Sequence, residues 1–276
     1  MGDSGRIGLV AVPREIQRLY DVLKLESEER YGASILRSGI VGKRPVALAE
    51  VPMGPVNAAL GAQALVIRHS VTALLSFGSA GALAGGLSTG DLVIAQQAIA
   101  HDAGTFLGRR FEPTGIVDRG EKGQIGWRRS FDADPGLVAL ALDAVQRLGV
   151  HAHTGTVVTG NQAIFSTARR RWLCRTFGAL AVEMETAAVA QVAVAHGLPW
   201  VAVRAISDAA SDELILDYCR LYFYLDDRRP AWRCQADRWS YLLTRPAAWR
   251  RLWYLRRGLV RASEQASRVV EAMLLS

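Results

Sequence analysis

The chain has 276 residues, half of them hydrophobic, and a net charge of +7. This length allows one large α/β domain whose core needs neither disulfides nor metals. The three cysteines include no CxxC pair, and their odd number does not fit a framework of paired disulfides. Both observations argue against a secreted disulfide scaffold. No secretory signal is recognisable at the N-terminus, so we expect a cytoplasmic protein.

The positive charge is concentrated at the C-terminal end. From Arg220 onwards the chain holds twelve arginines, no lysine and five acidic residues, and the preceding part balances 21 basic against 21 acidic residues. This asymmetry predicts a neutral body with a basic appendage. We expect a catalytic or binding domain over residues 1–217 and a basic, aromatic-rich helical extension over residues 218–276.

The body consists of alternating strand and helix patterns. Strand-like runs occur at 6–12, 45–51, 73–77, 91–100, 154–159 and 200–206, and helical spacing at 14–24, 56–68, 134–148, 167–177 and 182–197. Residues 105–133 are polar and irregular, which indicates a surface excursion. The alternation predicts an α/β fold, a three-layer α/β/α sandwich with a mostly parallel central sheet.

Several polar residues directly follow the predicted strands. Ligands collect at the carboxyl ends of strands in such sheets. The segments GSAG (78–81), GN (160–161) and SD (207–208) should therefore converge on one edge of the sheet. Glu15, just past the first strand, and Glu185, at a helix start, can join them there.

The residues alone leave the role of each carboxylate open. Glu183 and Glu185 are two positions apart, so on a helix they point in different directions and only one can face a cleft. Both can instead be first-turn acids that complement the helix dipole. Asp208 ends an apolar strand, where a carboxylate is costly unless it is paired or used, but an N-cap or Asx-turn also explains it. Glu15, taken by itself, is an ordinary solvated residue.

Motifs for cofactors and metals are missing from the sequence. The stretch GSAG fits neither GxGxxG nor GxxxxGK[ST], although its backbone can still form a concavity for a ligand. The histidines do not stand at metal-ligand spacing with the cysteines, and no GxSxG elbow is present. We therefore expect no cofactor, no metal and no serine-triad hydrolase.

Taken together, these segments resemble the nucleoside phosphorylase superfamily, in particular its branch of methylthioadenosine/S-adenosylhomocysteine nucleosidases. The resemblance spans residues 6 to about 212. Its most specific parts are VEME at 182–185 and RAISD at 204–208, in this order and at this separation. Further matching segments lie at 7–15, 53–59, 78–83, 90–91, 101–102 and 159–160.

The resemblance implies a purine nucleoside substrate, no cofactor and a homodimer. It implies that Asp208 protonates or hydrogen-bonds the leaving base and that Glu15 positions or deprotonates the attacking water. Glu185 would hold the ribose hydroxyls. Further residues are implied to lie at the substrate or beside the nucleophile: Gly78, Ser79, Ile164, Phe165, Val182, Glu183, Met184 and Ser207. Phe165 is the candidate for the aromatic residue that stacks on adenine in the nucleosidases.

The same resemblance bears on whether water or phosphate is the nucleophile. Related phosphorylases carry an arginine three residues before the serine of the glycine loop, where phosphate needs charged donors. Here that position is Ser76. The only nearby arginine that could bind phosphate instead is Arg14, in the loop after the first predicted strand. We expect hydrolysis, with phosphorolysis as the alternative. A second alternative is a non-catalytic binding protein of the same fold.

The C-terminal extension allows several interpretations. Aromatic and basic residues interleave in AWRRLWYLRRGLVR (248–261), on expected helices at 233–243 and 247–275. The extension can be a helical cover on the core, an interfacial helix at an anionic membrane, or, without a recognisable module, a nucleic-acid binder. It is also similar to the end of hopanoid-associated nucleosidase/phosphorylase proteins, which implies adenosylhopane as a candidate substrate and peripheral contact with the inner membrane face. Nucleic acid is not the expected partner.

Overall fold

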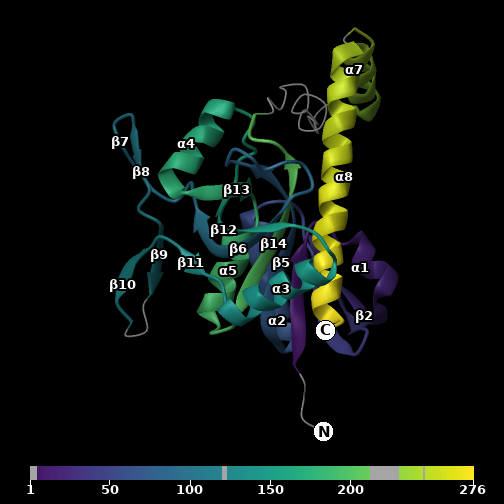
Figure 1. The fold of residues 1–276 in the computed structure, drawn as a ribbon, viewed down its shortest axis with the longest axis vertical. Helices are drawn as coiled ribbons and strands as arrows, with labels where there is room; N and C mark the ends of the chain where they lie inside the picture. Colours follow the sequence, from purple (N-terminus) through teal and green to yellow (C-terminus); the bar gives the residue numbers. More distant parts are fainter. Residues whose placement is uncertain (1–4, 120–122, 212–229, 245) are drawn as a thin grey trace.

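The computed structural model describes residues 5–119, 123–211, 230–244 and 246–276 (Figure 1). The N-terminal half contains β1 (Arg6–Ala11), α1 (Gln17–Val22), β2 (Lys24–Tyr31), β3 (Ser34–Val41), β4 (Arg44–Glu50), α2 (Pro55–His69), β5 (Val71–Ala82), β6 (Leu92–Ala100), β7 (Thr105–Leu107), β8 (Arg110–Glu112), β9 (Ile116–Arg119), β10 (Ile125–Arg128) and β11 (Phe131–Asp132). The C-terminal half contains α3 (Pro135–Arg147), β12 (Ala152–Thr159), α4 (Thr167–Phe177), β13 (Ala179–Glu183), α5 (Thr186–Ala195), β14 (Trp200–Asp208), α7 (Ala231–Thr244) and α8 (Pro246–Leu274).

One large mixed sheet organises the body. Its strand order is β11-β6-β12-β13-β5-β1-β4-β3-β2, and β14 pairs with both β5 and β6. Because β14 links β5 to β6, the strands β5, β13, β12, β6 and β14 close into a ring. The sheet continues from this ring through β1 to β4, β3 and β2.

The predicted α/β fold with a C-terminal helical extension is confirmed, but the mostly parallel three-layer sandwich is wrong. Parallel pairs join β1 to β4 and β5, β12 to β6 and β13, and β14 to β5. Antiparallel pairs join β2 to β3, β3 to β4, β5 to β13, and β6 to β11 and β14. The hairpins at residues 32–33 and 42–43 explain part of this result, because two-residue loops connect antiparallel strands. Gly32 and Gly42 supply the positive φ that such turns require.

The convergence of strand ends that the sequence predicts is present. β1, β5, β12, β13 and β14 end near the segments that carry Glu15, residues 78–81, residues 160–165, Glu185 and Asp208. The helix expected at 182–197 begins later, at Thr186, because residues up to Glu183 pair with β12 as the end of β13. Glu185 therefore occupies the turn between a strand and a helix.

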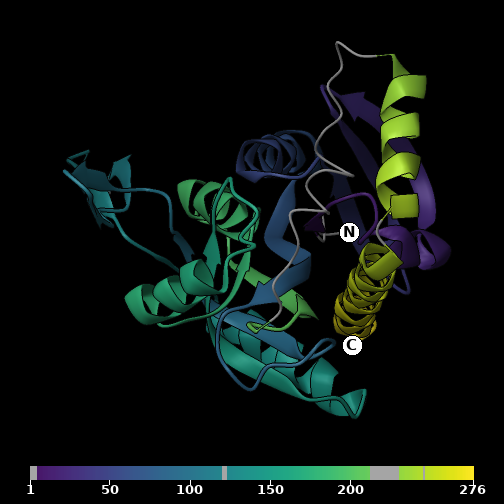
Figure 2. The same cartoon turned by 90° about the horizontal axis from the view of Figure 1, so that it is seen from above.

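The predicted C-terminal helices correspond to α7 and α8. The proposed domain boundary between residues 217 and 218 lies outside the described residues. The C-terminal half of α8 packs into the hydrophobic core of the body, through Ala262, Ala266, Val269, Val270, Met273 and Leu274. Seen from above, α7 and α8 lie at one edge of the molecule and the hairpins β7–β10 at the opposite edge (Figure 2). None of the described helices is both long enough and apolar enough to cross a membrane.

Candidate functional site

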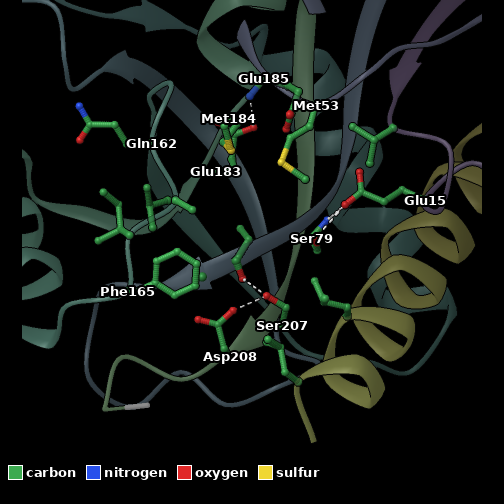
Figure 3. Close-up of a pocket in the computed structure, with 18 of the residues that line it drawn as sticks. Glu15, Met53, Ser79, Gln162, Phe165, Glu183, Met184, Glu185, Ser207 and Asp208 are labelled. Atoms are coloured by element: carbon green, nitrogen blue, oxygen red, sulfur yellow. Dashed lines mark hydrogen bonds between the residues drawn. The ribbon is translucent and has the colours of Figure 1, made fainter. Parts of the chain in front are cut away.

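A cavity opens where these strand ends meet. The empty space in and above it, which includes open solvent, amounts to about 760 Å³. Most of the residues predicted for the site line it: Glu15, Ser79, Ile164, Phe165, Val182, Glu183, Met184, Glu185, Ser207 and Asp208. Figure 3 shows Glu15 with Ser79 on one side of the cavity, and Asp208 with Ser207 and Phe165 on another. The sequence-predicted residues are thus brought together around one space.

Glu15 is buried in the loop after β1 and is not the solvated residue that its local sequence allows. Its Oε1 atom accepts hydrogen bonds of 2.6 Å from both the backbone N–H and the hydroxyl of Ser79. Burial raises the pKa of Glu15, and the nearby charge of Arg204 partly opposes this rise. A raised pKa makes Glu15 a better proton acceptor near neutral pH.

Gly78 contributes by leaving space rather than by lining the cavity. Its φ is +148°, and a Cβ at this position would lie 1.9 Å from Glu15 Oε2. Only glycine allows the carboxylate to approach the β5 backbone this closely. The predicted substrate contact of Gly78 therefore stays a prediction, while its packing against Glu15 is direct.

Asp208 ends β14 and is held from two sides. Arg170, fully buried on α4, forms an ion pair with Oδ2 of Asp208 and also donates to the backbone oxygens of Ile164 (3.1 Å) and Ala209 (2.7 Å). The hydroxyl of Ser207 contacts Oδ1 of Asp208 and the carbonyl oxygen of Ala80. These contacts fix the orientation of the carboxyl group at the cavity wall.

Glu183 and Glu185 diverge, and only Glu185 turns away from the start of α5. Oε2 of Glu183 accepts from the backbone N–H groups of Glu185 (2.9 Å) and Thr186 (2.8 Å), which satisfies free donors of the helix. Arg204 Nη2 lies 2.6 Å from the same oxygen, and Thr159 donates to Oε1. Of the two interpretations that the sequence leaves for Glu183, the acid that complements the start of the helix fits these contacts.

Glu185 is a further buried carboxyl of the cavity. Its Oε1 accepts a 3.0 Å bond from the N–H of Gly54, and its Oε2 lies 3.8 Å from Arg204 Nη1. Burial, with repulsion from Glu183 next in importance, raises the pKa of Glu185 to about 8. A group of three buried acids, Glu15, Glu183 and Glu185, thus shares one buried cation, Arg204.

Glu185→Gln is expected to flatten the dependence of stability on pH. A carboxyl with a higher pKa in the folded than in the unfolded protein favours folding at low pH, and this contribution is lost as the pH rises through the folded value. For Glu185 the loss extends from its usual pKa of 4.5 to about 8. Urea unfolding across this interval should show a decreasing free energy of unfolding for the wild type and a weaker decrease for the variant. Equal slopes would contradict the assignment.

The cavity also contains residues that the sequence did not indicate as site residues. Met53, Gln162, Arg170, Leu255 and Leu259 all line it. Met53 lies in the segment 53–59, which carries part of the family resemblance, so the sequence did indicate that this segment belongs near the site. Arg170 is one of three consecutive arginines on a helix, and the two leucines belong to the distant α8. Nothing local in the sequence distinguishes these three residues from solvated or packing ones.

Comparisons with known proteins identify the family to which the chain belongs. The family model of the phosphorylase superfamily matches residues 6–218. The 5′-methylthioadenosine/S-adenosylhomocysteine nucleosidase of Actinobacillus succinogenes is 34% identical over 75% of this chain and 87% of its own. The nucleosidase of the same name from Haemophilus influenzae is 31% identical over 77% of this chain and 90% of its own. The structure of the Neisseria meningitidis nucleosidase in complex with methylthio-immucillin-A has a TM-score of 0.73 over 98% of both chains, at 23% identity, and so shares the fold.

Proposed function

Because the chain belongs to the phosphorylase superfamily, among its nucleosidase enzymes, we propose that it hydrolyses the N-glycosidic bond of a 5′-substituted adenosine. The observation that carries this proposal is the position of Glu15 and Asp208 on different sides of one cavity. Glycosidic cleavage passes through an oxocarbenium-like state and needs a nucleophile on one face of the sugar and an acid at the leaving group. Their arrangement supports the assignment of one carboxylate to each task.

On the nucleophile side, Glu15 accepts a proton from water as the water oxygen forms its bond to C1′. Ser79, which donates two hydrogen bonds to Oε1 of Glu15, orients the carboxylate for this step. The raised pKa of Glu15 supports this role. Glu185 and Met184, which line the same cavity, bind the ribose, with Glu185 holding its hydroxyls.

On the leaving-group side, Asp208 donates a proton to N7 of the purine as the C1′–N9 bond breaks. The contacts of Ser207 support this assignment. A hydroxyl carries one proton, and Ser207 faces two oxygens, the carbonyl of Ala80 at 3.2 Å and Oδ1 of Asp208. That proton is donated to one of these oxygens at a time, so the Ser207 hydroxyl holds the carboxyl group in place and leaves its ion pair with Arg170 intact. Phe165 and Ile164, with the backbone at Val182 and Glu183, form the wall of the base site.

The charge of the cavity favours water over phosphate. Within the part of the chain that the structure describes, Arg170 is the one basic side chain that lines the cavity, and it is paired with Asp208. Arg204 is held by Glu183, Thr186 and Ser76, and Arg14 is exposed and does not line the cavity. A phosphate would need charge-assisted donors that are not already committed. Phosphorolysis is therefore the less favoured alternative.

The 5′ substituent defines three candidate substrates. Methylthioadenosine and S-adenosylhomocysteine are supported by the names of the relatives. Adenosylhopane, which carries a lipid at the 5′ carbon, is supported by the resemblance of the C-terminal extension and by the apolar side chains of Val12, Leu255 and Leu259 in the cavity wall. Adenine release from each compound, compared as kcat/KM, tests the proposal. Binding of all three without release would favour the non-catalytic alternative.

Glu15→Gln is expected to lower kcat by about 10²–10⁴-fold, the usual contribution of a positioned general base. The amide retains the size of the side chain and can still bond to Ser79, so binding should change little. Initial rates of adenine release provide the measurement, with Glu26→Gln on the exposed β2 strand as a control. A variant that retains the wild-type rate would remove Glu15 from the mechanism.

The family resemblance also predicts a homodimer. Light scattering coupled to size exclusion tests this prediction independently of activity. A mass of one chain, at concentrations where the enzyme is fully active, would contradict it.

A further inference from the structure

Helices α7 and α8 expose an unusual number of aromatic side chains. We define the α7–α8 surface by Trp232, Trp239 and Leu243 on α7 and by Trp253 and Tyr254 on α8. Each of these side chains is between 51% and 76% exposed. Large aromatic residues concentrated in one part of a molecule mark an interaction site. The question is which partner this surface contacts.

The charge of the surface indicates an anionic partner. Residues 246–261 contain five arginines and no acidic residue, in a chain whose first 219 residues are balanced. Arg256 and Arg257 are exposed on α8, and the guanidinium of Arg257 lies 4.4 Å from the ring centre of Trp253. Arg233 lies 5.2 Å from the ring centre of Trp232 in the same way. Aromatic and cationic groups thus alternate over the same part of the molecule.

This composition fits the interface of a lipid bilayer. Tryptophan and tyrosine place their rings at the headgroup level, while arginines bind anionic headgroups. In Figure 1, α7 and the N-terminal part of α8 project beyond the α/β body, so a flat surface can reach them without meeting that body. Since none of the described helices can span a membrane, the contact would be peripheral.

The same helix connects this surface to the cavity. Leu255 and Leu259 line the cavity, while their neighbours Tyr254 and Arg256 are exposed. Between the two leucines, Gly258 packs so closely on Ser207 that a Cβ would lie 2.2 Å from the Ser207 carbonyl oxygen. One stretch of α8 therefore contacts solvent, the cavity and the residue next to Asp208.

We infer that the α7–α8 surface docks on an anionic lipid bilayer and presents the cavity to a nucleoside that carries an apolar group at its 5′ end. The first part of this inference is independent of the activity. The second part rests on the proposed nucleosidase function. Docking would let the apolar 5′ group pass from the bilayer along α8 to the leucines without crossing water.

The test is co-sedimentation of the full chain with phosphatidylcholine vesicles that contain or lack phosphatidylglycerol. We expect binding that requires the anionic lipid and weakens with salt. Arg256→Gln/Arg257→Gln should weaken binding by about 25-fold, at about fivefold for each arginine near the surface. Trp253→Ser should weaken it as well.

Trp127→Ser is the matched control, because Trp127 is 63% exposed on β10, far from α8. It should bind vesicles like the wild type. Absence of wild-type binding to anionic vesicles, equal loss in the Trp127 control, or binding to duplex DNA in place of vesicles would overturn the inference. Methylthioadenosine cleavage by the arginine variant separates the outcomes. If the variant loses vesicle binding but still cleaves methylthioadenosine, the loss concerns docking and not folding or catalysis. If neither the wild type nor the variant cleaves it, the proposed function and the second part of the inference fail, while the docking result stands by itself.

Discussion

Replacing Asp208 with asparagine is expected to lower kcat by about 10²–10⁴-fold, the usual contribution of a positioned general acid. The amide keeps the shape of the side chain but cannot protonate the leaving base. Initial rates of adenine release measure the effect. Asp143→Asn, on the exposed face of α3, is the control and should retain the wild-type rate.

The Asp208 substitution also leaves Arg170 without its carboxylate partner. An uncompensated buried cation is destabilising, so a loss of activity must be separated from a loss of folding. The double variant Asp208→Asn/Arg170→Met removes both charges. If this variant is folded by circular dichroism and still inactive, the loss belongs to the chemistry. If it retains full activity, Asp208 is not the acid.

The second large effect is expected on stability. Arg204→Met should reduce the free energy of unfolding by about 3–5 kcal/mol, the usual result of removing one partner from a buried ion pair. Arg204 is almost fully buried, lies 2.6 Å from Glu183, and bonds to Thr186 (3.0 Å) and Ser76 (2.6 Å). Without it, three buried carboxyls would share the interior with no cation.

Urea unfolding near neutral pH measures this loss. The deficit should shrink at lower pH, where the pKa values of Glu15 and Glu185, already raised by burial, let these acids become neutral in the folded protein. Arg204→Lys retains the charge and should be less affected. A loss below about 1 kcal/mol, the range of an exposed pair, would contradict the account of the acid group.

Several parts of the fold could be predicted from local patterns. The expected helix at 167–177 has the same first and last residues as α4. Its ends are well defined because Ser166 caps the N-terminus and Gly178, with a left-handed φ, ends the helix. The expected helix at 134–148 differs from α3 only at its ends, where Asp134 acts as the N-cap. Capping residues and apolar periodicity are local signals, so the sequence carries them directly.

The sheet could not be predicted in the same way. Strands β2 and β3 are absent from the predicted elements. β2 is exposed along most of its length and carries mixed charges, unlike the apolar strands of the body. The closure of the ring depends on β14 pairing with β6 as well as β5, a contact between segments more than a hundred residues apart. The prediction of a mostly parallel sheet was wrong because the alternation of strands and helices does not determine which strands become neighbours.

The residues of the site also fall into two groups, those that the sequence pattern indicates and those that only tertiary packing brings to the cavity. Its carboxylates follow strands, and this position in the sequence, together with the family resemblance, indicated Glu15, Glu185 and Asp208. Arg170 and the leucines of α8 reach the cavity through tertiary packing, from a helix that follows the cavity loop and from the far end of the chain. Their residue types and spacing are those of an ordinary helix, so no local pattern distinguishes them.

The most direct test of the central claim is adenine release from 5′-methylthioadenosine in phosphate-free buffer, followed by chromatography of the base and the sugar. We predict free adenine and an unphosphorylated sugar, at a rate that added phosphate does not change, and release that is about 10²–10⁴-fold slower with Asp208→Asn. Release that requires phosphate and yields a sugar phosphate would contradict the assignment of water as the nucleophile.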